Sequence, residues 1–162
     1  MPTSGVPVHI PEDILQAVYE HARRAFPEEC CGWLLGSEGT STVTRIRPAD
    51  NAYSAGTHPT VQDRTKERAF VITGSDLMEL ARSFDGPEPA LIIYHSHPNG
   101  AAYFSPTDQA VAAGPWGGPA WPDVQYLVVG IDDQRVVESR LFDWDEVSKS
   151  FVEVGLLEGA AI

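Results

Sequence analysis

The chain has 162 residues, 43% of them hydrophobic and 21% charged, a composition typical of one globular domain large enough to bury a core. Its 23 acidic and 11 basic residues give a formal net charge of -12, so its surface repels phosphate backbones and nucleic acid is not an expected partner. The sequence has no apolar run long enough to span a membrane and no apolar core of a signal peptide, so we expect no membrane partner. Cys30 and Cys31 are adjacent, which disfavours a structural disulfide, so we expect a cytoplasmic protein.

The chain begins with a predicted amphipathic helix and two strands. Residues 10–29 place Ile14 and Val18, with further apolar side chains, at helical spacing between two prolines. Residues 30–36 are a short apolar segment, and residues 41–48 are rich in β-branched side chains. Both segments are therefore predicted to be strands.

A long polar segment precedes the second predicted helix. Residues 49–66 contain Gly, Pro and Asn without a period and are predicted to be a loop. A short strand is predicted at 68–72 and a helix at 74–86. The apolar segment 89–97 lacks polar alternation, which is typical of a strand in the centre of a sheet.

The last third of the chain predicts four more elements. They are a short helix at 106–114, strands at 124–132 and 135–144, and a C-terminal helix at 143–158. A rigid aromatic loop, 114–122, follows the short helix, and packing is the first expectation for its tryptophans, with contact to substrate as the alternative. The order of elements predicts an α+β fold: one domain around a mixed sheet, with its core over about residues 10–142.

Two histidines end the predicted central strand. Side chains at positions i and i+2 of a strand point to the same side, so His95 and His97 face together. Ser96 faces away from them, and we expect it to order the following loop, which Pro98 turns out of the sheet. A lone His-x-His pair also occurs without a metal, but two imidazoles on one face can form half of a metal site.

Asp108 is the candidate third ligand. It lies 11 residues beyond His97, which is enough chain to return the start of a helix to the strand end. His, His and Asp with one open position is the arrangement of a catalytic zinc, whose bound water has a pKa of roughly 7. The alternative is structural, because Ser105 and Pro106 before Asp108 are also the pattern of a helix N-terminus. The two interpretations are compatible.

The phrase "HSHPNGAAYFSPTD" at residues 95–108 resembles the zinc motif of the JAMM (MPN+) metalloprotease family. That motif is His-Ser/Thr-His-Pro, six residues, Ser, two residues and Asp. The resemblance covers about residues 10–142 and implies a curved mixed sheet flanked by helices. It also implies one Zn2+ per chain, with His95, His97 and Asp108 as metal ligands, and Ser105 as the hydroxyl that donates to the oxyanion of the reaction.

The same family carries a glutamate upstream of the zinc motif. The segment "FPEECCGWLLG" resembles the Pro-x-Glu-x-x-Gly segment of small prokaryotic members, and this alignment selects Glu29 rather than Glu28. A carboxylate near zinc that does not bind it can take a proton from the bound water and return it to the leaving amine. Glu28 is expected to be a solvated residue at a helix end.

Family members remove ubiquitin or ubiquitin-like proteins, and small prokaryotic members act on sulfur carriers. The chain has no room for the insertions that larger members use to grip ubiquitin. The resemblance therefore implies a zinc peptidase or isopeptidase acting after the C-terminal Gly-Gly of a ubiquitin-like or sulfur-carrier protein, with the loops 49–66 and 114–122 forming a groove. The alternatives are a non-catalytic scaffold and a general zinc peptidase. The oligomeric state stays open.

Overall fold

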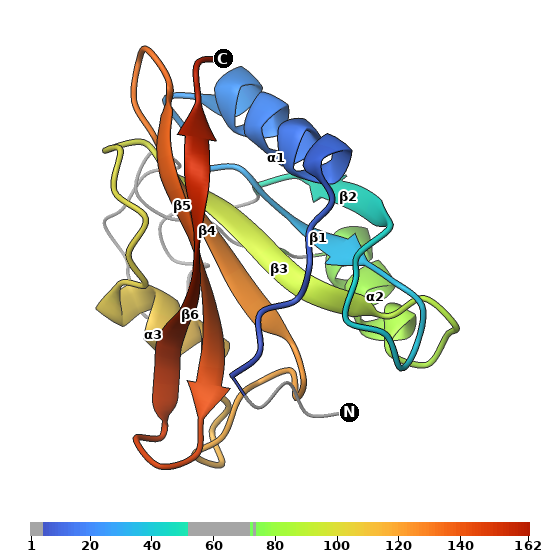
Figure 1. The fold of residues 1–162 in the computed structure, drawn as a ribbon. Helices are drawn as coiled ribbons and strands as arrows, with labels where there is room; N and C mark the ends of the chain where they lie inside the picture. Colours follow the sequence, from blue (N-terminus) through green and yellow to red (C-terminus); the bar gives the residue numbers. More distant parts are fainter. Residues whose placement is uncertain (1–4, 52–71, 73) are drawn as a thin grey trace.

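The structure is a computed structural model that describes residues 5–51, 72 and 74–162. Within these ranges it has three helices and six strands (Figure 1). In chain order they are α1 (Glu12–Ala25), β1 (Cys31–Leu35), β2 (Arg45–Ala49), α2 (Gly74–Ser83), β3 (Ala90–His97), α3 (Pro106–Ala112), β4 (Gln125–Ile131), β5 (Val136–Asp145) and β6 (Ser150–Ala160). None of the described helices has the length and apolarity needed to cross a membrane.

The six strands form one mixed sheet in the order β2-β1-β3-β4-β5-β6. The two central strands, β3 and β4, are parallel, and all the other neighbouring pairs are antiparallel. All five residues of β1 and all seven of β4 are buried, as expected for strands covered on both faces. The predicted α+β fold with a mixed sheet is confirmed.

Alternating side chains of the central strands divide the core into two clusters. Ile92 of β3 packs in the cluster that includes the buried face of α1, whereas Ile93 packs in the cluster that includes Leu80 of α2 and Ala112 of α3. Figure 1 shows α1 lying across one side of the sheet. Since side chains two apart on a strand share a face, the end of β3 beyond Ile93 presents its odd-numbered residues on the face of α2 and α3.

Helix α1 ends where the sequence requires it to end. Its first turn is acidic and its last turn contains Arg23 and Arg24, so the charges at both ends interact favourably with the helix dipole. Pro27 cannot continue the helix because it lacks a backbone N–H. The chain therefore turns after Phe26 and enters β1 at Cys31, which places Glu29 in the short connection between the two elements.

The predicted C-terminal helix at 143–158 is wrong. That segment contains the end of β5 and most of β6, which pair as an antiparallel hairpin from Val136 with Ala160 to Asp145 with Ser150. Lys149 closes the turn at a φ of 54°, a left-handed conformation that a helix does not use. Local residue types compatible with a helix are overridden here by pairing with β5.

The polar segment 49–66 and the predicted strand 68–72 lie mostly outside the described residues. Ala49 belongs to β2, and residues 50, 51 and 72 are described without helix or strand. The other predicted helices and strands are present, with boundaries shifted by a few residues.

Candidate metal centre

Three side chains of the motif that resembles a zinc site lie close together. The Nε2 atoms of His95 and His97 on β3 are 3.2 Å apart. Asp108, in the first turn of α3, brings its Oδ2 to 3.2 Å from Nε2 of His95 and 3.3 Å from Nε2 of His97. All three residues are buried. The structure thus brings two imidazole nitrogens and one carboxylate oxygen together at the corners of a nearly equilateral triangle.

The size of this triangle fits a tetrahedral metal ion. Nitrogen and oxygen ligands lie about 2.0–2.2 Å from zinc, and two corners of such a tetrahedron are about 3.3–3.6 Å apart. Of the three observed separations, one, 3.3 Å, lies at the short end of that range, and the other two, 3.2 Å, fall just below it. Two imidazoles and one carboxylate are also a donor set that zinc accepts. The residues present can therefore hold such an ion.

The protonation states of the three side chains suit metal binding. Nδ1 of His97 is 3.1 Å from the Ala101 carbonyl oxygen, so Nδ1 carries the proton and Nε2 offers its lone pair to the centre. Burial lowers the pKa of His95 and favours its neutral form. Burial alone would raise the pKa of Asp108, but the two neighbouring imidazoles outweigh burial and hold that pKa below its usual range, so the carboxylate is ionised.

A capping box aims the Asp108 carboxylate. Oγ of Ser105 accepts a hydrogen bond from the Asp108 backbone N–H at 3.0 Å, and the Ser105 N–H donates to Oδ2 of Asp108 at 2.9 Å. Pro106 occupies the first helical position, where its missing N–H costs nothing. The cap predicted from the sequence is confirmed, and it directs towards the histidines the same oxygen that caps the helix. The hydrogen of the Ser105 hydroxyl is not used by the cap.

The pairing of β1 with β3 positions Glu29. Cys31 lies opposite His95 in this antiparallel pair, so extending the register by two residues places Glu29 opposite His97. Glu29 is buried, and its carboxylate lies with the ring nitrogens of both histidines in a group whose ligand atoms are all within 4.8 Å of one another. Glu28 is exposed. The arrangement therefore places Glu29, and not Glu28, beside the candidate metal position.

Two polar residues hold the backbone around Glu29. Ser96 does not order the loop after β3 as expected. It faces away from the histidines, as predicted, but its Oγ accepts from the N–H of Cys30 at 2.8 Å, and its own N–H donates to the Cys30 carbonyl at 3.1 Å. Asn51 donates from Nδ2 to the Glu29 carbonyl at 3.0 Å. No sequence pattern points to Asn51, because it lies in a polar segment without a period.

Cys30 and Cys31 are free, buried thiols. Burial raises the pKa of Cys30 to about 12, and it also raises the pKa of Cys31 far above the usual value. Cys31 opens β1 and is buried there, as expected for a strand residue, whereas Cys30 is buried just before the strand begins.

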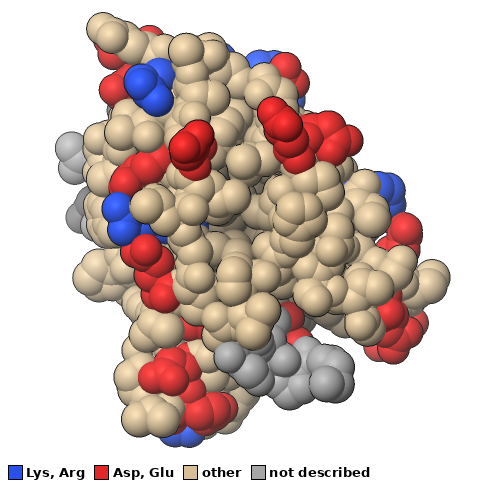
Figure 2. Space-filling model, in the orientation of Figure 1, with Lys and Arg blue, Asp and Glu red and all other residues tan. Residues whose placement is uncertain are grey.

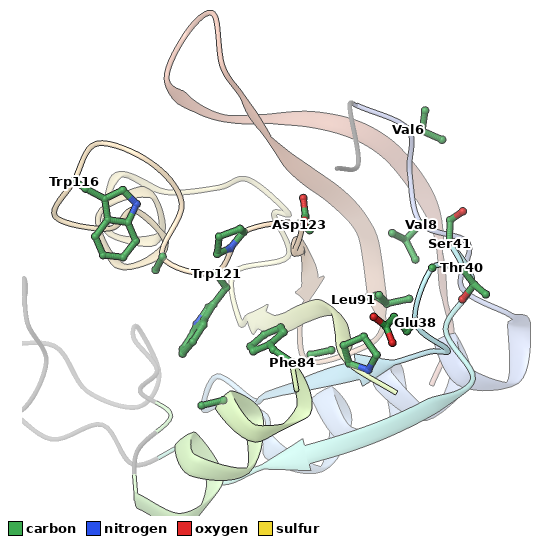
Figure 3. Close-up of a pocket in the computed structure, with 16 residues that line it drawn as sticks. Val6, Val8, Glu38, Thr40, Ser41, Phe84, Leu91, Trp116, Trp121 and Asp123 are labelled. Carbon is green, nitrogen blue, oxygen red and sulfur yellow. The ribbon is translucent and has the colours of Figure 1, made fainter. Parts of the chain in front are cut away.

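A cavity of about 950 Å³ lies away from the histidines (Figure 3). It is lined by Ala90 and Leu91 at the start of β3, roughly 20 Å along the strand from His97 at 3.3 Å per residue. Trp116 and Trp121 also line it. These two tryptophans of the 114–122 loop therefore face a cavity at the other end of β3, and the expected contact of this loop with substrate stays a prediction.

Comparison with protein families assigns the chain to a class. The sequence model of the prokaryotic homologues of the JAB domain, Prok-JAB, matches residues 11–143. The chain belongs to this family, and the resemblance inferred from the motif is confirmed.

Particular relatives are peptidases. The CysO-cysteine peptidases of Mycobacterium tuberculosis (strain H37Rv) and Mycobacterium bovis are each 32% identical to the chain over 130 residues, which is 80% of this chain and 77% of each relative. Together with the family match, this likeness supports a peptidase of the JAB type.

Two solved structures share the fold. A protein from Salinibacter ruber matches with a TM-score of 0.60 and 23% identity, over 93% of this chain and 90% of its own. A protein from Desulfitobacterium hafniense matches with a TM-score of 0.58 and 22% identity, over 90% of this chain and 88% of its own. At this level of identity the likeness concerns the fold alone.

Proposed function

We propose that the protein is a zinc-dependent peptidase that hydrolyses the amide bond after the C-terminal Gly-Gly of a ubiquitin-like sulfur carrier. The observation that carries the proposal is the convergence of His95, His97 and Asp108 to within 3.3 Å, with the buried carboxylate of Glu29 beside them. The name of the 32% identical relatives, CysO-cysteine peptidase, supports the substrate class.

Three side chains would hold one zinc ion per chain. The ligand atoms are Nε2 of His95, Nε2 of His97 and Oδ2 of Asp108. Bound zinc would supply a Lewis acid that lowers the pKa of water and polarises the scissile carbonyl. The Ala101 carbonyl keeps His97 in the tautomer that binding requires, and the Ser105 N–H keeps Asp108 aimed at the site.

Glu29 and Ser105 would carry the proton transfer and the charge stabilisation. The Glu29 carboxylate takes a proton from the attacking water and gives it to the nitrogen of the departing amine, as a general base and then a general acid. The Ser105 hydroxyl donates its hydrogen to the carbonyl oxygen as negative charge develops there, and a donor of this kind contributes about 3 kcal/mol. Its lone pair serves the helix cap at the same time.

A glycine tail suits this site because the ligands lie on buried elements. An extended chain that reaches them passes close to the backbone of β1 and β3, and glycine does so without a side-chain clash. Among the described residues, β2 is an edge strand next to β1 and offers a place for a tail to add as a further strand. A non-catalytic scaffold would have no need of five such side chains in one place.

The charge and the cysteines support the remaining expectations. Figure 2 shows acidic side chains spread over the face in view, with few basic ones among them, in keeping with a net charge of -12. This distribution favours a protein substrate over nucleic acid. Free cysteines fit a reducing compartment, and we keep the cytoplasm as the proposed location.

A carrier–cysteine cleavage assay tests the proposal. The zinc-loaded protein is incubated with a sulfur carrier that bears a cysteine or a short peptide after its final glycine, and the products are analysed by mass spectrometry. We expect release of the intact carrier ending in Gly-Gly. If unrelated peptides are cut as fast, or a Gly-to-Ala change at the cleavage point has no effect, a general zinc peptidase replaces this proposal. Absence of any cleavage with zinc bound would favour a scaffold.

A further inference from the structure

One peptide group links the candidate ligand His97 to a carboxylate on another strand. The carbonyl of Ala101 lies 3.1 Å from Nδ1 of His97 and accepts its proton. The N–H of the same peptide group belongs to Ala102 and donates to Oε2 of Glu138 at 3.0 Å. Glu138 on β5 is thus linked to His97 through the hydrogen bonds of a single peptide group.

The Glu138 carboxylate is held in place and kept ionised. Its Oε1 accepts from a guanidinium nitrogen of Arg140 at 2.9 Å, while its Oε2 faces the Ala102 N–H. A second guanidinium nitrogen of Arg140 donates to Glu153 on β6 at 2.7 Å. The hydrogen bonds from Arg140 and from the Ala102 backbone hold the pKa of Glu138 below its usual value. The negative charge is therefore present at neutral pH.

The bridging loop is packed tightly against β4. The Gly100 N–H donates to the Ile131 carbonyl at 3.1 Å. Gly130 has no side chain at the point where the loop crosses it, and a Cβ there would lie 2.6 Å from the Gly100 carbonyl oxygen and 2.8 Å from the Ala101 nitrogen. This close contact with β4, together with the hydrogen bond to Ile131, restricts the movement of the bridging peptide between Glu138 and His97.

We propose that Glu138 is a positioning residue for His97 and acts through the peptide group between Ala101 and Ala102. A carboxylate that accepts from the peptide N–H polarises the peptide and makes its carbonyl a stronger acceptor, since hydrogen bonds in a chain strengthen one another. A stronger bond from Nδ1 fixes the ring and raises the basicity of Nε2. The inference rests on the proposed function, in which His97 binds zinc.

The expected size follows from direct contacts of the same type. Loss of a partner that hydrogen-bonds a metal ligand directly lowers metal affinity by about 10- to 100-fold. Glu138 acts through one intervening peptide group, so the effect should lie at or below the lower end of that range. We expect Glu138→Gln to weaken zinc binding by about 5- to 10-fold, because it removes the charge and leaves one acceptor oxygen for two donors.

The test compares zinc affinity, measured by competition with a chelator, in the wild type, Glu138→Gln and Glu153→Gln. Glu153 is the matched control, because it contacts Arg140 but not the bridging peptide. We expect weaker binding in Glu138→Gln alone. The NMR signal of the Nδ1 proton of His97 in the zinc-loaded protein should also move upfield in that variant, and thermal unfolding of the metal-free forms shows whether the variants are folded.

The outcomes separate this inference from the proposed function. A wild type that does not bind zinc refutes both. A wild type that binds zinc, with unchanged affinity and an unchanged Nδ1 proton signal in Glu138→Gln, overturns the role of Glu138 and leaves the proposed function standing. Equal losses in Glu138→Gln and Glu153→Gln would assign the effect to the ion pairs of Arg140 and would also overturn it. If Glu138→Gln does not fold, Glu138→Asp, which keeps the charge, must bind zinc more tightly than Glu138→Ala.

Discussion

Replacing Glu29 by Gln should remove most of the activity while leaving the metal in place. The glutamine keeps the shape of the side chain but cannot accept a proton from water. Glu29 is only 4% exposed, so bulk buffer cannot easily act as the base in its place. The other carboxylate at the site, Asp108, is occupied by the Ser105 N–H and by both histidines. A general base with no substitute contributes about 100- to 10,000-fold.

We therefore expect kcat of Glu29→Gln to fall by at least about 100-fold, which corresponds to about 2.7 kcal/mol in the barrier. The assay measures turnover of the carrier–cysteine substrate together with the zinc content of each preparation. Glu28→Gln is the matched control, since Glu28 is the neighbouring residue but is exposed, and it should retain near wild-type turnover. If Glu28→Gln loses activity and Glu29→Gln keeps it, the assignment of the proton carrier from the β1–β3 register is refuted.

Two further predictions concern the ligand on α3 and the histidine on α1. Asp108→Ala should lower zinc affinity by at least about tenfold, and loss of the capping box should lower the melting temperature of the metal-free protein by about 2–4 °C. Asp108→Asn keeps an acceptor for the Ser105 N–H, so it should lose zinc affinity without the fall in melting temperature. Equal melting temperatures for the two variants would contradict the capping role. Burial and the nearby Arg24 lower the pKa of His21 below its unfolded value of about 6.5, while Asp50 opposes this shift. The stability linked to neutral His21 is therefore complete above about pH 6.5 and is lost as the pH falls towards the folded pKa. The fall in melting temperature from about pH 7.5 to about pH 5.5 should thus be smaller in His21→Gln than in the wild type, and an equal fall would show that His21 does not contribute.

The convergence of His95, His97 and Asp108 was predictable from the sequence because it depends on local geometry. Side chains two positions apart on a strand lie on the same face of the sheet, which brings His95 and His97 together. The cap pattern at Ser105 fixes the start of α3, so the orientation of Asp108 follows from its place in the first turn. Only the length of the loop between them had to allow the return, and 11 residues were enough.

The position of Glu29 could not be derived in the same way. It depends on the pairing of Cys31 with His95, two residues 64 positions apart in the chain, and no local pattern encodes that register. The family resemblance selected Glu29, and the register places it beside His97. The link from Glu138 to His97 was not predictable either, because it requires the conformation of the loop after β3 as well as the place of β5 in the sheet.

In the C-terminal hairpin, the local sequence pattern predicted the wrong secondary structure. Residues 143–158 contain Glu, Leu and Lys, which favour a helix in isolation. In the folded chain, Phe151 is buried against the aromatic side chains Phe104 and Tyr126. The segment pairs along β5, and a helix could not satisfy that edge of the sheet. Tertiary pairing decided the outcome, and the sequence of the segment alone does not reveal it.

The burial of Cys30 and Cys31 beside the site has a consequence for oxidation. Thiols react with peroxide and with alkylating agents as thiolates. Burial raises the pKa of Cys30 to about 12, so its thiolate is rare at neutral pH. Cys31, whose pKa is raised still further by burial, is ionised even less often. The two sulfur atoms at the start of β1, beside the candidate metal centre, are thereby protected against sulfenic-acid formation and against mixed disulfides with free cysteine.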